Sequence, residues 1–320
     1  MRKKITQISL IIIINIFIML LLIFLSDIAV YSYHVITYRK NHADAFKPPF
    51  FSYLIKPRYG IDFKTYFDGS DNVFRGRKPD GLEYKNKEPI IIFGCSYAHG
   101  QFLKYNQTFS YKLAHILKRP VYNRAVPGRG IGCMYWQSID DNFYSSVPPS
   151  NTVLYVIIPD HYRRLYINFI DILDTHMTGH FNKKGNDLIL DGSNYLKNIL
   201  ISSYSFKVLN SKYVNWYINN PKYEDEITDL VLLYFLKTRE NLEKHWNKKI
   251  NFTIIFYNNY KLLYSESLYK KLKANNFNVI ETDKLYNVNL NSKEYLNPDN
   301  GHPTEKTWDL LTPLIAERLK

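Results

Sequence analysis

The stretch Pro89-Ile-Ile-Ile-Phe-Gly-Cys-Ser-Tyr-Ala-His-Gly100 carries the strongest fold signal in the chain. Its residues Ile90–Phe93 form a short, unbroken apolar run, which is typical of a strand buried on both faces of a parallel sheet. Gly94 permits a sharp turn, Ser96 follows it, and a helical pattern begins at about Gln107. This order places a hydroxyl above the carboxyl end of a sheet. An ordinary strand-to-helix turn in which Ser96 only caps the helix fits the stretch equally well.

A second informative stretch lies near the C-terminus, where residues 297–304 read Asn-Pro-Asp-Asn-Gly-His-Pro-Thr. Asp299 and His302 lie three residues apart in a turn rich in glycine and proline, so the carboxylate can orient the imidazole locally. The imidazole can then take the proton from Ser96, which is a poor nucleophile until a base does so. We therefore predict Ser96 as nucleophile, His302 as base and later acid, and Asp299 as the group that orients His302.

An early serine block combined with a late Asp-x-x-His block resembles the SGNH/GDSL hydrolases. The resemblance covers residues 89–320, with a long insertion in the middle. It implies a flavodoxin-like fold and serine esterase chemistry that needs no cofactor. The chain departs from the family at Cys95, where aspartate is usual, and in the block after the third strand, which has no asparagine.

Strand-like and helix-like segments alternate along this region, which predicts an α/β fold. We expect a doubly wound, mostly parallel five-stranded sheet with helices on both faces. The expected strands are residues 90–93, 121–126, 152–158, 250–257 and 277–281, and the expected helices are residues 107–118, 133–144, 221–246, 262–274 and 304–319.

The chain divides into three predicted regions. Residues 1–30 form a membrane anchor, residues 31–87 a stalk and an arm that packs along the next domain, and residues 88–320 the hydrolase domain. An insertion at about residues 165–220 carries a small hairpin at 181–190 and is expected to shape one side of the site.

The anchor is predicted from residues 5–25, which are almost wholly apolar and long enough to span a bilayer. Arg2, Lys3 and Lys4 precede them and favour a cytoplasmic N-terminus. This predicts a single-pass plasma-membrane protein whose catalytic domain is extracytoplasmic. A cleavable signal peptide is the competing interpretation, but the apolar run is longer than such peptides need.

Two backbone N–H groups, of Ser96 and of Gly128 in the loop after the second strand, are predicted to bind the oxyanion. Asp160 stands near the place where the family has its asparagine, and an ionised carboxylate cannot donate a hydrogen bond. His161 can donate instead, or Asn123 can reach in from the second strand.

The competing interpretation of this region is structural. Asp160, His161 and Arg164 then form a polar cluster in which Asp160 and Arg164 brace the rim as an ion pair. The oxyanion site is in that case reduced to two backbone donors.

Composition excludes several other functions. The 320-residue chain has a net charge of +13. It contains no run of five Lys or Arg residues and no nucleic-acid motif, which disfavours nucleic-acid binding. The charge instead indicates a preference of the protein for an anionic envelope surface, or serves only to keep the protein solvated. The two cysteines, Cys95 and Cys133, are too few for a disulfide scaffold, although one bond between them is conceivable. His176 and His180 lie in a loop-like segment, which disfavours a metal site.

Three functions remain open from the sequence. The first is a membrane-anchored esterase that removes acyl groups such as acetyl from an envelope or exported glycan, or cleaves a small ester. The second is an acyltransferase that uses the same triad, because only water exclusion and acceptor binding separate the two. The third is a glycan-binding or assembly protein that keeps the fold without useful turnover. A dinucleotide-binding domain is disfavoured because no Gly-x-Gly-x-x-Gly follows the first strand.

Overall fold

The structure is a computed structural model of the chain. It describes residues 14–15, 18–19, 21–22, 24–26, 29, 79–166, 181–190, 212–257, 265–297 and 301–320. Among these residues, no helix is both long and apolar enough to cross a membrane. Most of the predicted span at residues 5–25 lies outside the described residues, and so do His176 and His180.

The chain forms two compact units. The larger comprises Phe63–Asp171, Thr175–Asp191 and Trp216–Lys320, and the smaller comprises Met1–Asp62, Ile172–Asp174 and Gly192–Asn215. In the smaller unit, the structure describes only helical residues between 14 and 29 and at 212–215. The fold and the site described below belong to the larger unit.

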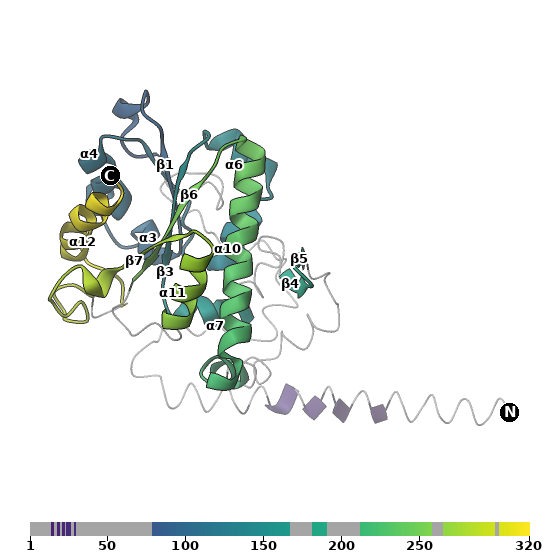
Figure 1. The fold of residues 1–320 in the computed structure, drawn as a ribbon. Helices are drawn as coiled ribbons and strands as arrows, with labels where there is room; N and C mark the ends of the chain where they lie inside the picture. The colour runs from purple at the N-terminus through teal and green to yellow at the C-terminus, as the bar shows by residue number, and fades with distance from the viewer. Residues whose placement is uncertain are drawn as a thin grey trace. The chain divides into compact units, whose positions relative to one another are not determined.

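A five-stranded sheet with the order β2-β1-β3-β6-β7 is the centre of the larger unit (Figure 1). All its neighbouring strands pair in parallel, which confirms the predicted α/β sheet. Every residue of β1 and β3 is buried, as the unbroken apolar sequence of β1 predicts for a central strand. The strands are β1 (Ile90–Phe93), β2 (Val121–Asn123), β3 (Thr152–Ile157), β6 (Asn251–Phe256) and β7 (Asn278–Glu281).

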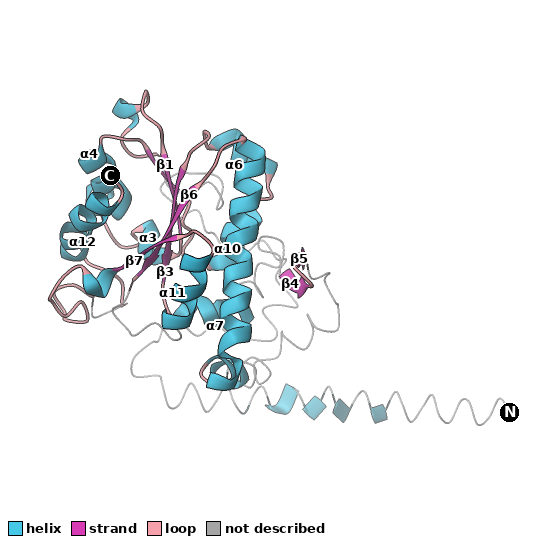
Figure 2. Cartoon of the chain, viewed as in Figure 1, coloured by secondary structure: helices cyan, strands magenta, loops and turns pink. Residues whose placement is uncertain are grey.

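Helices cover both faces of the sheet (Figure 2). On one face, α4 and α12 meet through Phe109 and Trp308, whose rings stack at 4.9 Å between centroids. On the other face, Tyr155 of β3 packs edge-to-face against Phe235 of α10 at 5.2 Å. The helices are α3 (Ser96–His99), α4 (Phe109–Leu117), α5 (Ile131–Gln137), α6 (Asp141–Ser146), α7 (Asp160–Tyr166), α10 (Glu224–Trp246), α11 (Ser265–Ala274) and α12 (Glu305–Arg318), with the 3-10 turns η2 (Leu82–Tyr84), η3 (Tyr105–Gln107), η4 (Pro221–Tyr223) and η5 (Thr282–Lys284).

Two predicted elements differ from those observed. The single helix expected at residues 133–144 is two helices, α5 and α6, because the Asp140 side chain accepts a hydrogen bond from Asn142 N–H and starts a new helix there. No helix was expected directly after the third strand, but the residues from Asp160 onward form α7. This difference matters at the site, because residues four apart on a helix lie on the same face.

The hairpin predicted at residues 181–190 is present as β4 (Phe181–Lys184) and β5 (Asp187–Leu190), which pair in antiparallel fashion. Its turn contains Gly185 with a φ of 62°. Tyr234 of α10 donates to the carbonyl of Phe181, and Lys237 of α10 pairs with Asp187 at 2.7 Å. The long helix α10 therefore fixes both strands of the hairpin.

Part of the predicted arm is described and lies along the free edge of β2. Asp80 and Val121 exchange two backbone hydrogen bonds of 2.9 Å in an antiparallel bridge. Such a bridge covers backbone groups that an edge strand otherwise leaves unpaired. The limits of the arm at residues 31–87 stay a prediction, because residues 31–78 lie outside the described part.

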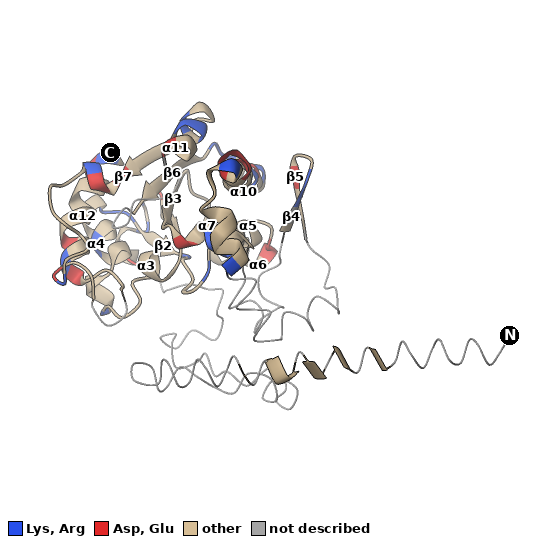
Figure 3. Ribbon diagram, turned by 90° about the horizontal axis from the view of Figure 1, so that it is seen from below, with Lys and Arg blue, Asp and Glu red and all other residues tan. Residues whose placement is uncertain are grey.

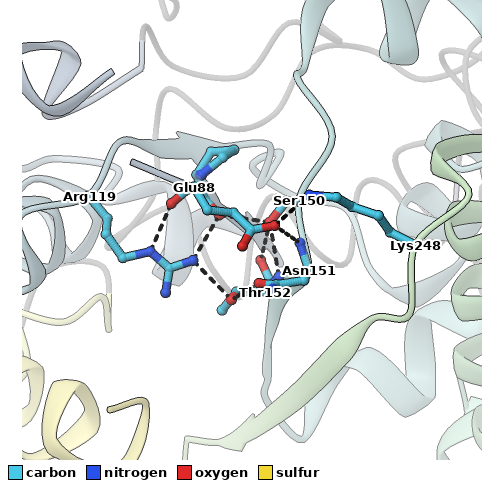
Figure 4. A network of polar contacts seen from close by, with 7 residues as sticks. Glu88, Arg119, Ser150, Asn151, Thr152 and Lys248 are labelled. Atoms are coloured by element: carbon cyan, nitrogen blue, oxygen red, sulfur yellow. Dashed lines mark hydrogen bonds and ion pairs between the residues drawn. The ribbon is translucent and has the colours of Figure 1, made fainter. Parts of the chain in front are cut away.

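A polar network joins the amino ends of the central strands (Figure 4). The Glu88 carboxylate accepts from Asn151 N–H at 3.0 Å and pairs with Lys248 at 2.9 Å. The Arg119 guanidinium donates to the Glu88 carbonyl at 2.8 Å and to the Thr152 hydroxyl at 3.0 Å. These contacts fix the amino ends of the strands, on the side of the sheet opposite to their carboxyl ends.

Acidic and basic residues are interspersed on the outer helices, and both signs occur on α10 and α12 in the ribbon of Figure 3. Lys271 of α11, for example, pairs with Asp225 and Asp229 of α10 at 3.0 and 2.7 Å. Exposed pairs of this kind contribute little to stability individually. The expected preference for an anionic surface stays a prediction.

Candidate active site

Three segments meet at the carboxyl edge of the sheet. Ser96 begins α3 after β1, Gly128 lies in the loop after β2, and Asp160 begins α7 after β3. Because the three strands are parallel neighbours, their ends lie side by side on one rim. Open α/β sheets bind ligands outside this rim.

The turn that carries Ser96 depends on Gly94. Its φ is 150°, and a Cβ atom there would come within 2.8 Å of the Ala98 Cβ. Gly94 therefore lets α3 begin directly against the strand, with Cys95 as its N-cap residue. Ser96 as a whole residue is only slightly exposed, at 6%.

His302 reaches Ser96 from the other end of the chain. His302 Nε2 lies 2.8 Å from Ser96 Oγ across a separation of 206 residues. Two contacts hold the C-terminal turn in place: Tyr97 donates its hydroxyl proton to the Gly301 carbonyl at 2.6 Å, and Asn297 N–H donates to the His302 carbonyl at 2.8 Å. The structure thus brings together the predicted nucleophile and the predicted base.

Asp299 lies outside the described residues, so its position relative to His302 stays a prediction. A serine and an imidazole at hydrogen-bond distance are sufficient for a proton to pass from the hydroxyl to the ring. The arrangement can therefore generate a serine alkoxide in the presence of an electrophile.

Gly128 lies next to the Ser96 turn. The Val126 N–H donates to the Gly94 carbonyl at 3.0 Å, and the Arg129 N–H donates to the Val126 carbonyl at 3.1 Å, which closes a tight turn over Gly128. The φ of 74° at Gly128 is one that glycine adopts readily in such turns. Its role as an oxyanion donor, like that of the Ser96 N–H, stays a prediction.

Asn123 is fully buried, and its side-chain amide is hydrogen-bonded to other residues of the core. Its Nδ2 donates to the Ala98 carbonyl at 2.8 Å and to the Ser110 hydroxyl at 3.1 Å, while its Oδ1 accepts from Ala125 N–H at 3.1 Å. Both amide protons are thereby used, and the side chain fixes α3 and α4 against β2.

Asp160 forms the ion pair with Arg164 that the structural interpretation expects. Arg163 Nε lies 2.6 Å from Asp160 Oδ1, and Arg164 Nε lies 2.6 Å from Asp160 Oδ2. Burial alone would raise the pKa of this carboxyl, but the two guanidinium groups outweigh it and hold the pKa below its ordinary value. Arg163 was not singled out from the sequence, although its spacing of three residues would have indicated it had α7 been recognised as a helix.

Arg164 also joins α7 to the loop that contains Gly128, because its guanidinium donates to the Arg129 carbonyl at 2.6 Å. The Asp160 carboxylate thus positions an arginine that in turn fixes the predicted oxyanion loop.

His161 is completely buried beside this pair. Its Nδ1 lies 3.0 Å from the Tyr155 hydroxyl and 3.5 Å from the Ile158 N–H. A backbone N–H can only donate, so Nδ1 is the acceptor and Nε2 carries the proton. Burial, assisted by the charge of Arg164, holds the pKa of His161 well below its ordinary value and keeps the ring neutral. Nε2 has no hydrogen-bond partner among the described residues and is covered from solvent, so a role for His161 as an oxyanion donor stays a prediction.

Cys95 and Cys133 are both buried free thiols, so the conceivable disulfide between them does not form. Burial raises the pKa of Cys133, which disfavours its thiolate form. Within the described part of the chain, no group of three or more His, Cys, Asp or Glu residues is arranged to hold a metal ion.

Two aromatic rings beside His302 were not recognised from the sequence. The Tyr97 and Phe102 ring centroids lie 5.3 and 5.0 Å from that of His302. Tyr97 directly follows Ser96, which is a weak signal available in the sequence. Nothing in the sequence indicates Phe102, because its contact with His302 exists only in the folded chain.

No protein-family model matches the sequence, and neither does any curated protein. Solved structures with a similar arrangement include a member of the lipolytic protein G-D-S-L family from Veillonella parvula DSM 2008, at 14% identity and a TM-score of 0.38, covering 72% of this chain and 97% of that one. An acetyl xylan esterase from the rumen bacterium Butyrivibrio proteoclasticus is 10% identical with a TM-score of 0.37, covering 73% of this chain and 63% of that one. Both TM-scores are below 0.5, so the chemistry assigned below rests on this chain's own residues.

Proposed function

We propose that this protein is a serine esterase with Ser96 as nucleophile and His302 as general base. The observation that carries the proposal is the 2.8 Å contact between Ser96 Oγ and His302 Nε2, made between segments 206 residues apart. A contact over such a separation forms only when the tertiary fold brings the two segments together. A serine that only caps a helix contacts the backbone two or three residues away, so capping does not account for the contact with His302. Asp299 is proposed to orient the His302 ring.

The proposed reaction proceeds in two steps. Ser96 Oγ attacks the ester carbonyl while His302 takes its proton, and the N–H groups of Ser96 and Gly128 stabilise the oxyanion. His302 then gives the proton to the leaving alcohol, which leaves an acyl group on Ser96. Water, activated by the same imidazole, releases the acid and restores the hydroxyl.

Acyl groups on an envelope or exported glycan, acetyl foremost, are the proposed substrates. The proposal is supported by the basic charge of the chain and by the predicted membrane anchor, which together favour work near an anionic surface outside the cytoplasm. A sugar hydroxyl in place of water would make the same site an acyltransferase.

Covalent labelling tests the nucleophile. A fluorophosphonate probe is expected to label the wild-type protein on Ser96, because it captures a serine activated by a base. Ser96→Ala is expected to abolish labelling, His302→Ala to slow it strongly, and the exposed-helix variant Ser145→Ala to leave it unchanged. Peptide mass spectrometry identifies the labelled residue. A folded wild-type protein that takes up no probe would instead favour a glycan-binding or assembly protein without turnover.

We also propose a single-pass topology with the N-terminus inside the cell and residues 88–320 outside the plasma membrane. The proposal rests on Arg2, Lys3 and Lys4 ahead of the apolar run at residues 5–25. Protease added to intact spheroplasts is expected to degrade most of the chain, followed with an antibody to the C-terminal domain. Complete protection of that domain would contradict the orientation.

A further inference from the structure

Phe102 lies in the turn between α3 and η3 and has an unusual backbone conformation. Its φ is 70°, a left-handed value that a bulky residue rarely adopts, and the residue is 58% exposed. A glycine or an asparagine at this position would have the same backbone with less strain. The fold alone therefore gives no reason for a large apolar ring here.

The turn around Phe102 is held by the backbone of the nucleophile. Gly100 and Gln101 both donate their N–H groups to the Ser96 carbonyl, at 3.1 and 3.0 Å. Gly100 has no room for a side chain, because a Cβ there would come within 2.7 Å of Thr108 Cγ2. Phe102 is thus placed by the same short segment that carries Ser96.

The Phe102 ring lies against the ring of the proposed base. The two centroids are 5.0 Å apart with the planes at 75°, an edge-to-face contact, while Tyr97 contacts the same imidazole at 5.3 Å. Tyr97 is partly covered and hydrogen-bonded to Gly301, so of the two rings Phe102 is the one with more surface open to solvent.

This placement decides which part of an ester Phe102 can touch. His302 has to protonate the leaving oxygen, so the alcohol part of the substrate lies within hydrogen-bond distance of His302 Nε2. The carbonyl oxygen, in contrast, points toward the proposed donors at Ser96 and Gly128. An exposed ring that packs on the imidazole is therefore next to the alcohol and not the acyl part.

We propose that Phe102 is a specificity-determining residue that binds the apolar face of a sugar ring in the alcohol part of the ester. The inference rests on the proposed esterase function and adds to it the class of leaving group. A pyranose presents several C–H groups on one face, and an aromatic ring is the side chain that covers such a face without needing hydrogen bonds. The strained, exposed position of Phe102 is explained if the ring is covered by substrate.

Three acetyl esters that differ only in their alcohol test the proposal: methyl 6-O-acetyl-glucopyranoside, cyclohexylmethyl acetate and ethyl acetate. Phe102→Asn removes the ring while keeping a residue that tolerates a positive φ, and Phe102→Trp is the matched control that keeps an aromatic face. We expect Phe102→Asn to lower kcat/KM for the sugar ester about tenfold, mainly through KM, and to change ethyl acetate hydrolysis less than twofold. Phe102→Trp is expected to stay within threefold of wild type on the sugar ester.

The melting temperature checks the fold of each variant, and Phe102→Asn is expected to melt no lower than wild type because it relieves backbone strain. Equal losses on the sugar ester and on ethyl acetate would overturn the proposal, since Phe102 would then act only through His302. A loss confined to cyclohexylmethyl acetate would also overturn it, because the bound group would be apolar without being a sugar.

Failure of the esterase proposal gives a different result. If the wild type hydrolyses none of the three esters, binding of methyl 6-O-acetyl-glucopyranoside is measured by NMR titration of the wild type and of Phe102→Asn. A Kd that is about tenfold weaker in Phe102→Asn supports the sugar contact in a protein without turnover. Equal binding by the two proteins, or binding by neither, overturns the inference about Phe102.

Discussion

Ser96→Ala and His302→Ala are each expected to lower kcat for an acetyl ester about 10⁴-fold or more, and the double variant is expected to be scarcely worse than either single one. The two side chains share one proton through a 2.8 Å contact, so removing either partner removes the same step. Residues that act as a unit in this way show strongly non-additive losses. Initial rates of the three variants against wild type, measured at saturating ester, test the expectation.

Two comparisons make this result specific. Asp299→Asn is expected to reduce kcat less than either alanine variant, because the nucleophile and the base are both still present, although the asparagine favours the unproductive tautomer of His302. Ser145→Ala on the exposed end of α6 is expected to keep full activity, since its hydroxyl donates to the Asn142 carbonyl of its own helix. Fully additive losses in the double variant would show that His302 does not serve Ser96.

The sheet and the Ser96–His302 pair could be anticipated from the sequence because each has a local signal. Ile90–Phe93 is apolar at every position, and the two end blocks carry their residue types in short, turn-rich motifs. The position of Ser96 on the rim then follows from parallel strand order alone. The meeting of the two blocks in space was expected from the resemblance to the SGNH/GDSL hydrolases, because strand order alone does not place residues 297–304.

Other parts of the site were not accessible from the sequence, because they depend on contacts between distant segments. In the sequence, Asn123 is a polar residue at the end of a predicted strand. Its hydrogen bonds to Ala98 and Ser110 in the structure show that it belongs to the core. The position of Phe102 depends on the hydrogen bonds that Gly100 and Gln101 donate to the Ser96 carbonyl. The presence of a glycine in the sequence predicts a turn there, but not these hydrogen bonds. The start of α7 at Asp160 was not predicted, although the preceding Pro159 is compatible with it, because proline is common around the first turn of a helix.

The second large effect is expected at Asp160. Asp160→Ala is expected to lower the free energy of unfolding by about 2–3 kcal/mol, because it leaves Arg163 and Arg164 next to each other, largely covered and without their shared carboxylate. Asp309→Ala is the matched control: it removes an acidic residue whose side chain is 56% exposed and pairs with Lys112, and it is expected to cost less than about 1 kcal/mol. Urea unfolding at pH 7 measures both variants.

The pH dependence distinguishes an ion pair from simple loss of packing. Because the folded pKa of Asp160 lies below its unfolded value, the unfolded chain binds the extra proton first as the pH falls. The contribution of the pair is therefore complete above roughly pH 4 and is lost as the pH falls through the lowered folded pKa. The stability difference between wild type and Asp160→Asn should accordingly be constant from pH 7 to 5 and shrink below pH 4. A difference that is the same at pH 3 and pH 7 would contradict the ion pair.

Since Arg164 holds the Arg129 carbonyl, Asp160→Asn should also lower kcat by loosening the loop of Gly128, whereas Asp309→Ala should not.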